Sequence, residues 1–384
     1  MRGHHLLDKL ELVDPAYVEA ADRVPQKKHT WRKWAALAAC IGLLASGIFS
    51  AVPSEPPEPA NLQAITIPEY GHGAMGFEGY LCYDIAELDN GNPWSEDMAL
   101  SSLPVYRNGA YDPTGAGIPR GLSEAQMQER LAFAASALGL EVFEMEVITT
   151  GDQGTDPTEL RAVTNNGTLY IQANGAIVCF LPDGGQALPD GYSFTHGDTT
   201  QAQAEETISY LADAYQDILC FEEPKAVSAG DYTFTGVFTR SYCVYDAAGD
   251  DLSDILNYHF RSARFSADDS GNLSSFRVED RLLLAEKLGD YPVISVEEAT
   301  ELLAGGHYQT SVPTPFPGTE YIGKVELSYR TGSREEVLLP YYRFYVQLPD
   351  ETSALDLKTY GVYYVPALAQ EYIANMPTYD GSFN

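Results

Sequence analysis

The sequence predicts an α+β protein with a single N-terminal transmembrane helix, a Pro-rich spacer and then repeated helix-plus-antiparallel-sheet modules. Three observations support this prediction. An uncharged apolar run lies near the N-terminus, proline and glutamate dominate the segment after it, and a helical pattern followed by strand-like segments then occurs three times. Helices that alternate with blocks of consecutive strands typically pack on one face of an antiparallel sheet. The three rounds share their order but not their residues, so they indicate repeated architecture rather than a sequence repeat.

Residues 1–33 form the predicted cytoplasmic tail. Asp14 and Pro15 suit the N-cap and the first position of a short helix over residues 16–24. A tail of this length cannot build a core of its own. We therefore expect it either to act as a plain topology signal or to dock on a membrane or cytoplasmic regulatory protein.

Residues 34–52 form the predicted transmembrane helix. The run Ala35–Val52 has 18 residues and no charge, and at about 1.5 Å per residue it covers about 27 Å, nearly the thickness of a bilayer core. Four basic residues precede it closely, whereas Glu55 and Glu58 follow it. The positive-inside rule then places the N-terminus in the cytoplasm and the C-terminal domain outside the cell membrane.

Two alternatives to a single-pass anchor remain open, namely a cleaved signal peptide and a buried core helix. A signal peptide has a shorter charged region before its apolar run, whereas 34 residues precede this one. A helix packed on the surface of a core shows a polar stripe, and this run is apolar on every face. An uncleaved anchor is the favoured interpretation.

The chain beyond residue 34 is strongly acidic. The whole protein has a formal net charge of −32, and residues 1–34 contain more basic than acidic residues. An acidic domain repels phosphate backbones, so nucleic acid is not expected as a partner. The charge indicates either a surface that keeps an exported domain soluble or a cationic binding partner.

Residues 53–60 form the predicted spacer, which is rich in proline and glutamate and therefore extended. It separates the predicted membrane helix from two predicted extracytoplasmic α+β domains. The first domain covers residues 61–198, and the second covers residues 199–384.

The first predicted domain contains one helix followed by a meander of strands. Ser123 and Gln126 match a capping box for a helix that ends near residue 138. Asn-Gly pairs at residues 166–167 and 174–175 predict hairpin turns. The strands expected in this domain cover residues 79–85, 103–106, 142–150, 159–165, 168–173 and 176–181.

The second predicted domain contains two further helices, each followed by strands. The first helix covers residues 199–217, and Ser295 with Glu298 matches a capping box at the start of the other. The expected strands cover residues 231–245, 257–266, 272–278, 321–329, 338–348 and 361–365. The two predicted domains together contain the three rounds of a helix followed by strands.

The third round resembles regulatory modules of bacteria. It contains the stretches YPVISVEEATELL, VELSYRTG, LLPYYRFYVQL and YGVYYVPAL. These are similar to PepSY-like modules and to the YycI/YycH-like ectodomains that sit beside a sensor kinase in low-GC Gram-positive bacteria. In that family a helix beginning S-x-x-E-A precedes strands that end in P-x-x-x-F. The matching residues here are Ser295, Glu298, Ala299, Pro340 and Phe344.

The N-terminal part carries a second resemblance. The stretches VDPAYVEAAD and WRKWAALAAC look like the beginning of sigma-linked membrane proteins of the same bacteria. Together the two resemblances imply a single-pass signalling regulator whose partner is a sigma factor or a sensor kinase.

The sequence contains no recognisable catalytic or metal-binding motif. G-x-S-x-G, S-x-x-K and P-loop patterns are absent, and the outer histidines have no metal-ligand spacing. We therefore expect no catalytic residue, no cofactor and no metal site. Four cysteines outside the predicted membrane helix allow three disulfide pairings, and buried free thiols are equally compatible with their apolar surroundings. These cysteines are Cys82, Cys179, Cys220 and Cys243.

The most distinctive local feature is a cluster of aromatic residues between residues 341 and 364. Strand alternation sends Tyr342 and Phe344 to one face of a sheet and Tyr341 and Tyr345 to the other. One face is expected to be core. The other is either a second packed face or an exposed tyrosine surface of the kind that binds partners. The candidate interaction surface consists of Tyr341, Tyr345, Tyr360 and Tyr363.

These observations predict a membrane-anchored, extracytoplasmic regulatory or sensory binding protein that is not an enzyme. Its outer domain would bind an envelope ligand or protein, and its tail would contact a regulatory protein. Two alternatives remain open. One is a tethered structural or envelope-associated surface protein, and the other is an envelope hydrolase whose catalytic residues converge only in three dimensions.

Overall fold

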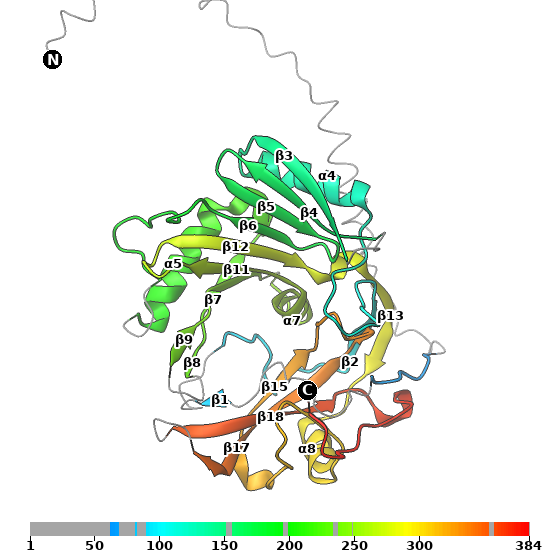
Figure 1. Ribbon diagram of the computed structural model, residues 1–384. Coiled ribbons are helices and arrows are strands. Elements are labelled where there is room, and N and C mark those ends of the chain that lie inside the picture. The colour runs from blue at the N-terminus through cyan, green and yellow to red at the C-terminus, as the bar shows by residue number, and fades with distance from the viewer. Residues whose placement is uncertain are drawn as a thin grey trace, which may run out of the picture. The chain divides into compact units, whose positions relative to one another are not determined.

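The computed structural model describes residues 62–68, 81–82, 90–150, 156–194, 199–232, 237–247, 249–352 and 357–383 (Figure 1). All of them belong to one compact unit, residues 61–384. The predicted cytoplasmic tail, membrane helix and spacer lie outside the described residues. Within the described residues no helix is both long enough and apolar enough to cross a bilayer.

The predicted α+β fold class is wrong, because the described part of the chain is mostly β. It has 38% strand, 22% helix and five α-helices. The three helices predicted after residue 122 are present, but strands also form where the sequence shows no alternation. An example is β13 (Ala285–Pro292), which has the sequence AEKLGDYP. It pairs with β2 (Ser102–Asn108), which in turn pairs with β16 (Val337–Leu338), so these strands make a three-stranded sheet.

The largest sheet has eight antiparallel strands in the order β3-β4-β5-β6-β12-β11-β10-β7 (Figure 1). It consists of two modules, each with a helix followed by four strands, and the modules join through their last strands, with Cys179 of β6 opposite Phe276 of β12. The first module contains α4 (Glu124–Ala137), β3 (Val142–Thr149), β4 (Pro157–Thr164), β5 (Gly167–Gln172) and β6 (Ile177–Phe180). The second contains α5 (Gln201–Ala214), α6 (Gln216–Leu219), β7 (Pro224–Val227), β10 (Cys243–Asp246), β11 (Arg261–Ala267) and β12 (Leu273–Asp280).

The module arrangement corrects the predicted domain boundary. Residues 61–198 and 199–384 were expected to form separate domains, but β6 and β12 come from opposite sides of that boundary and pair in one sheet. The first two predicted rounds of helix and strands therefore share a sheet. The sequence contains no signal for this pairing, because it joins strands about 100 residues apart.

The capping boxes at Ser123 and Ser295 were predicted correctly. Ser123 and Ser295 each form a capping box, and Thr200 forms another at the start of α5. The predicted Asn-Gly turns lie between β4 and β5 and between β5 and β6. Gly167 has a φ of 107°, and a Cβ there would lie 2.1 Å from the Phe180 carbonyl oxygen, so only glycine fits this position.

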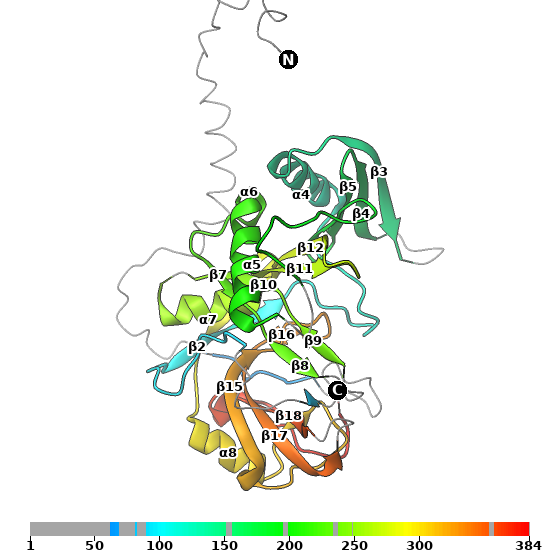
Figure 2. The ribbon, with the colours of Figure 1, turned by 90° about the vertical axis from the view of Figure 1, so that its left-hand side faces the viewer.

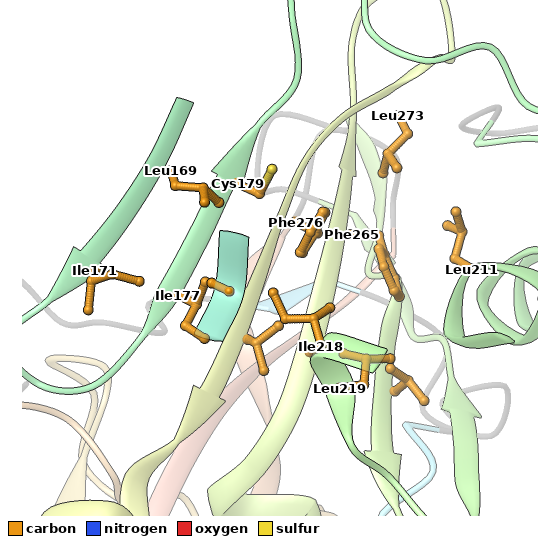
Figure 3. Packing of buried hydrophobic residues seen from close by; sticks show 14 of the residues in the cluster. Leu169, Ile171, Ile177, Cys179, Leu211, Ile218, Leu219, Phe265, Leu273 and Phe276 are labelled. Atoms are coloured by element: carbon orange, nitrogen blue, oxygen red, sulfur yellow. The ribbon is translucent and has the colours of Figure 1, made fainter. Parts of the chain in front are cut away.

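One face of the eight-stranded sheet is covered by the helices. Alternate strand residues such as Leu169, Ile171 and Phe276 point into one apolar core with Leu211 of α5 and Ile218 of α6 (Figure 3). In β4, β5 and β11 the buried residues alternate with half-buried or exposed ones. The side chains of the opposite face are therefore half-buried or exposed, which is the usual pattern for an antiparallel sheet with one solvated face.

The second large sheet has the order β15-β17-β18-β1-β8-β9, and β14 also pairs with β18. It contains β15 (Ile322–Tyr329), β17 (Pro340–Thr352), β18 (Lys358–Pro366), β1 (Leu81–Cys82), β8 (Gly230–Tyr232), β9 (Phe238–Arg240) and β14 (Gln309–Thr310). One face packs on α8 (Val296–Ala304). Three short 3₁₀ helices cover Arg281–Leu284, Thr319–Tyr321 and Gln370–Tyr372.

Helix α7 (Asp251–Phe260) was missed by the sequence analysis, which placed a strand over residues 257–266. Asp250 caps the helix by accepting a hydrogen bond from the Ser253 N–H. Its buried side chains include Ile255 and Phe260, which lie in the core of the second large sheet. The strand begins only after this helix, with β11 at Arg261.

The short segment 62–68 is held by the C-terminal part of the chain. The Ile65 N–H donates to the Tyr372 carbonyl at 2.7 Å. The Asn375 side chain bonds to both backbone groups of Ile67, as a neighbouring strand would. Its oxygen accepts from the Ile67 N–H at 2.7 Å, and its amide donates to the Ile67 carbonyl at 2.8 Å. Ile65 and Ile67 are 5% and 2% exposed. This segment is therefore part of the core.

Replacing Asn375 by alanine is expected to lower the free energy of unfolding by about 1–3 kcal/mol. The substitution removes two hydrogen bonds to Ile67 and leaves backbone groups of a buried residue unpaired. Urea unfolding followed by circular dichroism measures the change. Gln370→Ala, at an exposed position nearby, is the control and should change stability by less than about 0.5 kcal/mol. Equal losses in the two variants would contradict the role given to Asn375.

Candidate functional site

The predicted tyrosine interaction surface is wrong, because all four residues are buried. Tyr341, Tyr345, Tyr360 and Tyr363 are 1%, 2%, 1% and 0% exposed. The predicted alternation itself is correct, since Tyr342 and Phe344 pack in the core beside α8, whereas Tyr341 and Tyr345 pack in the core on the opposite face. Tyr363 lies in the first of these cores and Tyr360 in the second. Of the two alternatives for the second face, the structure shows a packed face and not an exposed one.

The second face is covered by segments distant in sequence. Ile65 and Ile67 from the start of the described chain, Tyr291 from β13 and Ile373 from the C-terminal segment all belong to the core that contains Tyr341. Since no local pattern links these segments to β17 and β18, the sequence did not predict the cover.

Charged side chains are buried among these tyrosines. The Tyr345 hydroxyl donates to Glu326 Oε2 at 2.9 Å, and Glu326 is 3% exposed. Lys324 forms an ion pair with Glu326, and the Arg343 guanidinium lies 4.5 Å from the centre of the Tyr345 ring. Ion pairs and aromatic faces satisfy these charges inside the protein. Within this cluster Glu326 and Tyr345 are buried, whereas the Lys324 and Arg343 side chains are 27% and 19% exposed.

Two features of the described residues bear on catalysis, namely their metal-ligating side chains and a polar hollow. None of their His, Cys, Asp and Glu side chains gather in groups of three that could hold a metal ion. A polar hollow between Asn108, Asn174, Arg281 and Ser333 has a volume of about 30 Å³. This is room for one or two water molecules, whereas small-molecule sites are typically about 300–1,000 Å³.

The cysteines are single thiols where the structure describes them. Cys179, Cys220 and Cys243 are free, and no pairing among these three occurs. Burial raises the pKa of the Cys179 thiol to about 12, so it is protonated at neutral pH. The Cys82 side chain lies outside the described residues.

The strand β3 is the strongest candidate for a binding site. It lies at one margin of the eight-stranded sheet and pairs only with β4 among the described strands (Figures 1 and 2). Every residue from Val142 to Glu146 is exposed. Six large hydrophobic side chains are exposed in the described chain, and three of them belong to β3. These three are Val142, Phe143 and Met145, which are 38%, 65% and 47% exposed.

The exposure of β3 arises from the position of α4. The buried residues of this helix, including Met127 and Leu131, pack with Leu160 of β4 and Leu169 of β5. In β3 only Val147 contributes to that core, and it is partly buried. A β-bulge between Val142 and Glu144 makes Phe143 the extra residue of the strand. The apolar side chains of β3 therefore lie beside the core rather than under a helix.

Sequence analysis predicted a strand over residues 142–150 but not its exposure. The segment VFEMEVIT alternates glutamates with apolar residues, which fits any half-buried strand. The edge position depends on which strands pair in the middle of the sheet, and that pairing had no local signal.

No protein-family model, no curated protein and no solved structure matches this chain. The resemblance to PepSY-like and YycI/YycH-like regulators stays a prediction.

Proposed function

We propose that this chain is a non-enzymatic regulatory binding protein that acts outside the cytoplasm and binds a partner protein along β3. The observation that carries the proposal is an edge strand on which the apolar side chains of Val142, Phe143 and Met145 are exposed. Edge strands of soluble proteins are normally short, charged or covered, because an open edge pairs with other chains. A partner can use such an edge by adding its own strand, with backbone hydrogen bonds supplying affinity and side chains supplying specificity.

The contrast with the other edge of the same sheet supports this proposal. Strand β7 has four residues, begins with Pro224 and continues with Lys225. Proline lacks a backbone donor and an edge lysine discourages pairing. Strand β3 has eight residues and neither proline nor lysine. Among the described strands of this sheet, β7 thus has proline and lysine at its edge, and β3 lacks both.

The proposal is tested by photo-crosslinking in intact cells. A photoreactive benzoyl-phenylalanine replaces Phe143 or Met145 in the full-length chain. We expect both positions to give the same adduct with another protein, since both side chains lie on the exposed strand. The control position is Val237, which precedes β9 and is 58% exposed.

Adducts that form equally from all three positions would contradict a binding role for β3. A tethered structural protein, the second candidate function in the sequence analysis, would give no adduct selective for β3. Placement outside the cytoplasm is part of the proposal, and protease added to intact cells should therefore cut residues 61–384. Resistance to that protease, with cutting after lysis, would overturn the placement.

A further inference from the structure

The two faces of β3 differ in chemistry. Met145 and Val147 lie opposite Ala162 and Leu160 of β4, which are fully buried, so they share the face covered by the helices. A strand added beside β3 would place alternate side chains next to Met145 and Val147. Apolar residues suit those positions, because they would extend the existing core.

The open face of β3 is acidic. Glu144 lies opposite Val163, and Glu146 lies opposite Arg161. The ion pair between Glu146 and Arg161 is loose at 3.5 Å, and the two side chains are 62% and 42% exposed. Residues 140–150 contain three glutamates and no basic residue. The alternate side chains of an added strand would lie beside these carboxylates, where lysine or arginine is favoured.

The same charges disfavour a second copy of this chain as the occupant. If two β3 strands paired antiparallel around Met145, Glu144 of each copy would lie opposite Glu146 of the other. Like charges directly opposite in a strand pair are destabilising. The formal net charge of −32 adds to the repulsion between copies.

We infer that the partner binds β3 with an extended segment in which apolar residues alternate with lysine or arginine. This inference rests on the proposed function and specifies the chemistry of the partner. The apolar residues would pack beside Met145 and Val147, and the basic residues would pair with Glu144 and Glu146. The backbone groups at the outer side of β3 would supply the ladder of hydrogen bonds.

Three synthetic peptides of ten residues test the inference against the full-length chain in mild detergent. The first alternates valine and lysine, the second alternates valine and glutamate, and the third has five valines followed by five lysines. Fluorescence anisotropy in 150 mM salt measures binding. We expect the alternating valine–lysine peptide to bind at least tenfold more tightly than either control peptide. The third peptide has the same charge as the first, so it corrects for general attraction of cations to an acidic protein.

Variants then assign the binding to β3. In Glu144→Lys/Glu146→Lys, affinity for the valine–lysine peptide should fall at least tenfold, and affinity for the valine–glutamate peptide should rise. The control is Glu206→Lys/Asp213→Lys, which makes the same charge change at exposed positions of α5 and should leave both affinities within about twofold. Hydrogen exchange should also slow in residues 142–149 when the peptide is bound.

Two outcomes would overturn the inference. The first is equal binding of the alternating valine–lysine peptide and the peptide of five valines followed by five lysines, which would show that binding does not depend on alternation. The second is a dimer of this chain that Met145→Asp dissociates, which would identify a second copy as the occupant. Selective crosslinking of another protein from Phe143 would still support the proposed function if the peptides failed, so the two failures are distinguishable.

Discussion

Replacing Arg330 by methionine is expected to lower the free energy of unfolding by about 3–5 kcal/mol. Arg330 Nε lies 3.1 Å from Glu335 Oε1, and the two side chains are 4% and 5% exposed. The guanidinium also donates to Gln309 Oε1 at 2.9 Å and lies 5.2 Å from the centre of the Tyr364 ring. Methionine keeps the apolar length of the side chain but leaves the Glu335 carboxylate buried without its counter-charge. Urea unfolding at pH 7 measures the loss.

A double variant separates the unpaired charge from lost packing. In Arg330→Met/Glu335→Leu neither position of this ion pair carries a charge. At least half of the stability lost in Arg330→Met should therefore return. The exposed ion pair between Arg107 and Glu286, with a distance of 2.7 Å and side chains 57% and 67% exposed, provides a control. Arg107→Met should cost less than about 1 kcal/mol. The double variant is also compared with the single variant Glu335→Leu. If the losses of Arg330→Met and Glu335→Leu simply added in the double variant, packing on the tyrosines and not the ion pair would explain the effect.

Elements with strong local signals could be predicted from the sequence, because their physical cause is local. The capping boxes at Ser123 and Ser295 and the turns at Gly167 and Gly175 depend on residues within three or four positions of each other. Helix α7 had such a signal too, since Asp250 precedes apolar residues at helical spacing. It was missed because the β-branched and aromatic residues after it also suit a strand.

The tyrosine cluster shows the limit of periodicity. Alternation assigned Tyr342 and Tyr341 to opposite faces, as observed. Periodicity cannot say whether a face meets water, because that depends on the segments that pack over it. Here Ile65 and Ile373, about 300 residues apart, cover the face for which the sequence left exposure and packing open. Strand β3 is the converse case. Its composition is that of an ordinary half-buried strand, but residues 142–146 are exposed at the edge of the sheet.

His259 is expected to make the stability of the protein sensitive to acid. Burial lowers the pKa of its imidazole from 6.5 to about 4, and the positive charge of Arg343 acts in the same direction. A hydrogen bond with the Leu327 backbone and the charge of Glu326 oppose this shift but do not compensate it. The ring packs against Tyr258 and Tyr329, with centroids 4.9 and 5.7 Å away. Protonation would therefore place a charge among aromatic side chains.

The direction of the pH effect follows from the two pKa values. Between about pH 6.5 and pH 4 the unfolded chain binds a proton at His259 that the folded chain does not bind. The free energy of unfolding therefore falls as the pH falls through this range. Each pKa unit corresponds to about 1.4 kcal/mol, so the full loss from this residue is about 3 kcal/mol.

Urea unfolding of the wild type and of His259→Gln at several pH values between 7 and 4 tests this expectation. Glutamine does not titrate, so the variant should lose less stability than the wild type over the range, by about 3 kcal/mol in total. Tyr258→Phe is the matched control, because it removes the hydrogen bond to the Asn90 carbonyl without removing a group that titrates in this range. Its stability should be lower than that of the wild type by the same amount at every pH. Parallel curves for the wild type and His259→Gln would instead assign the acid sensitivity to the carboxylates, since these are the other groups that take up protons as the pH approaches 4.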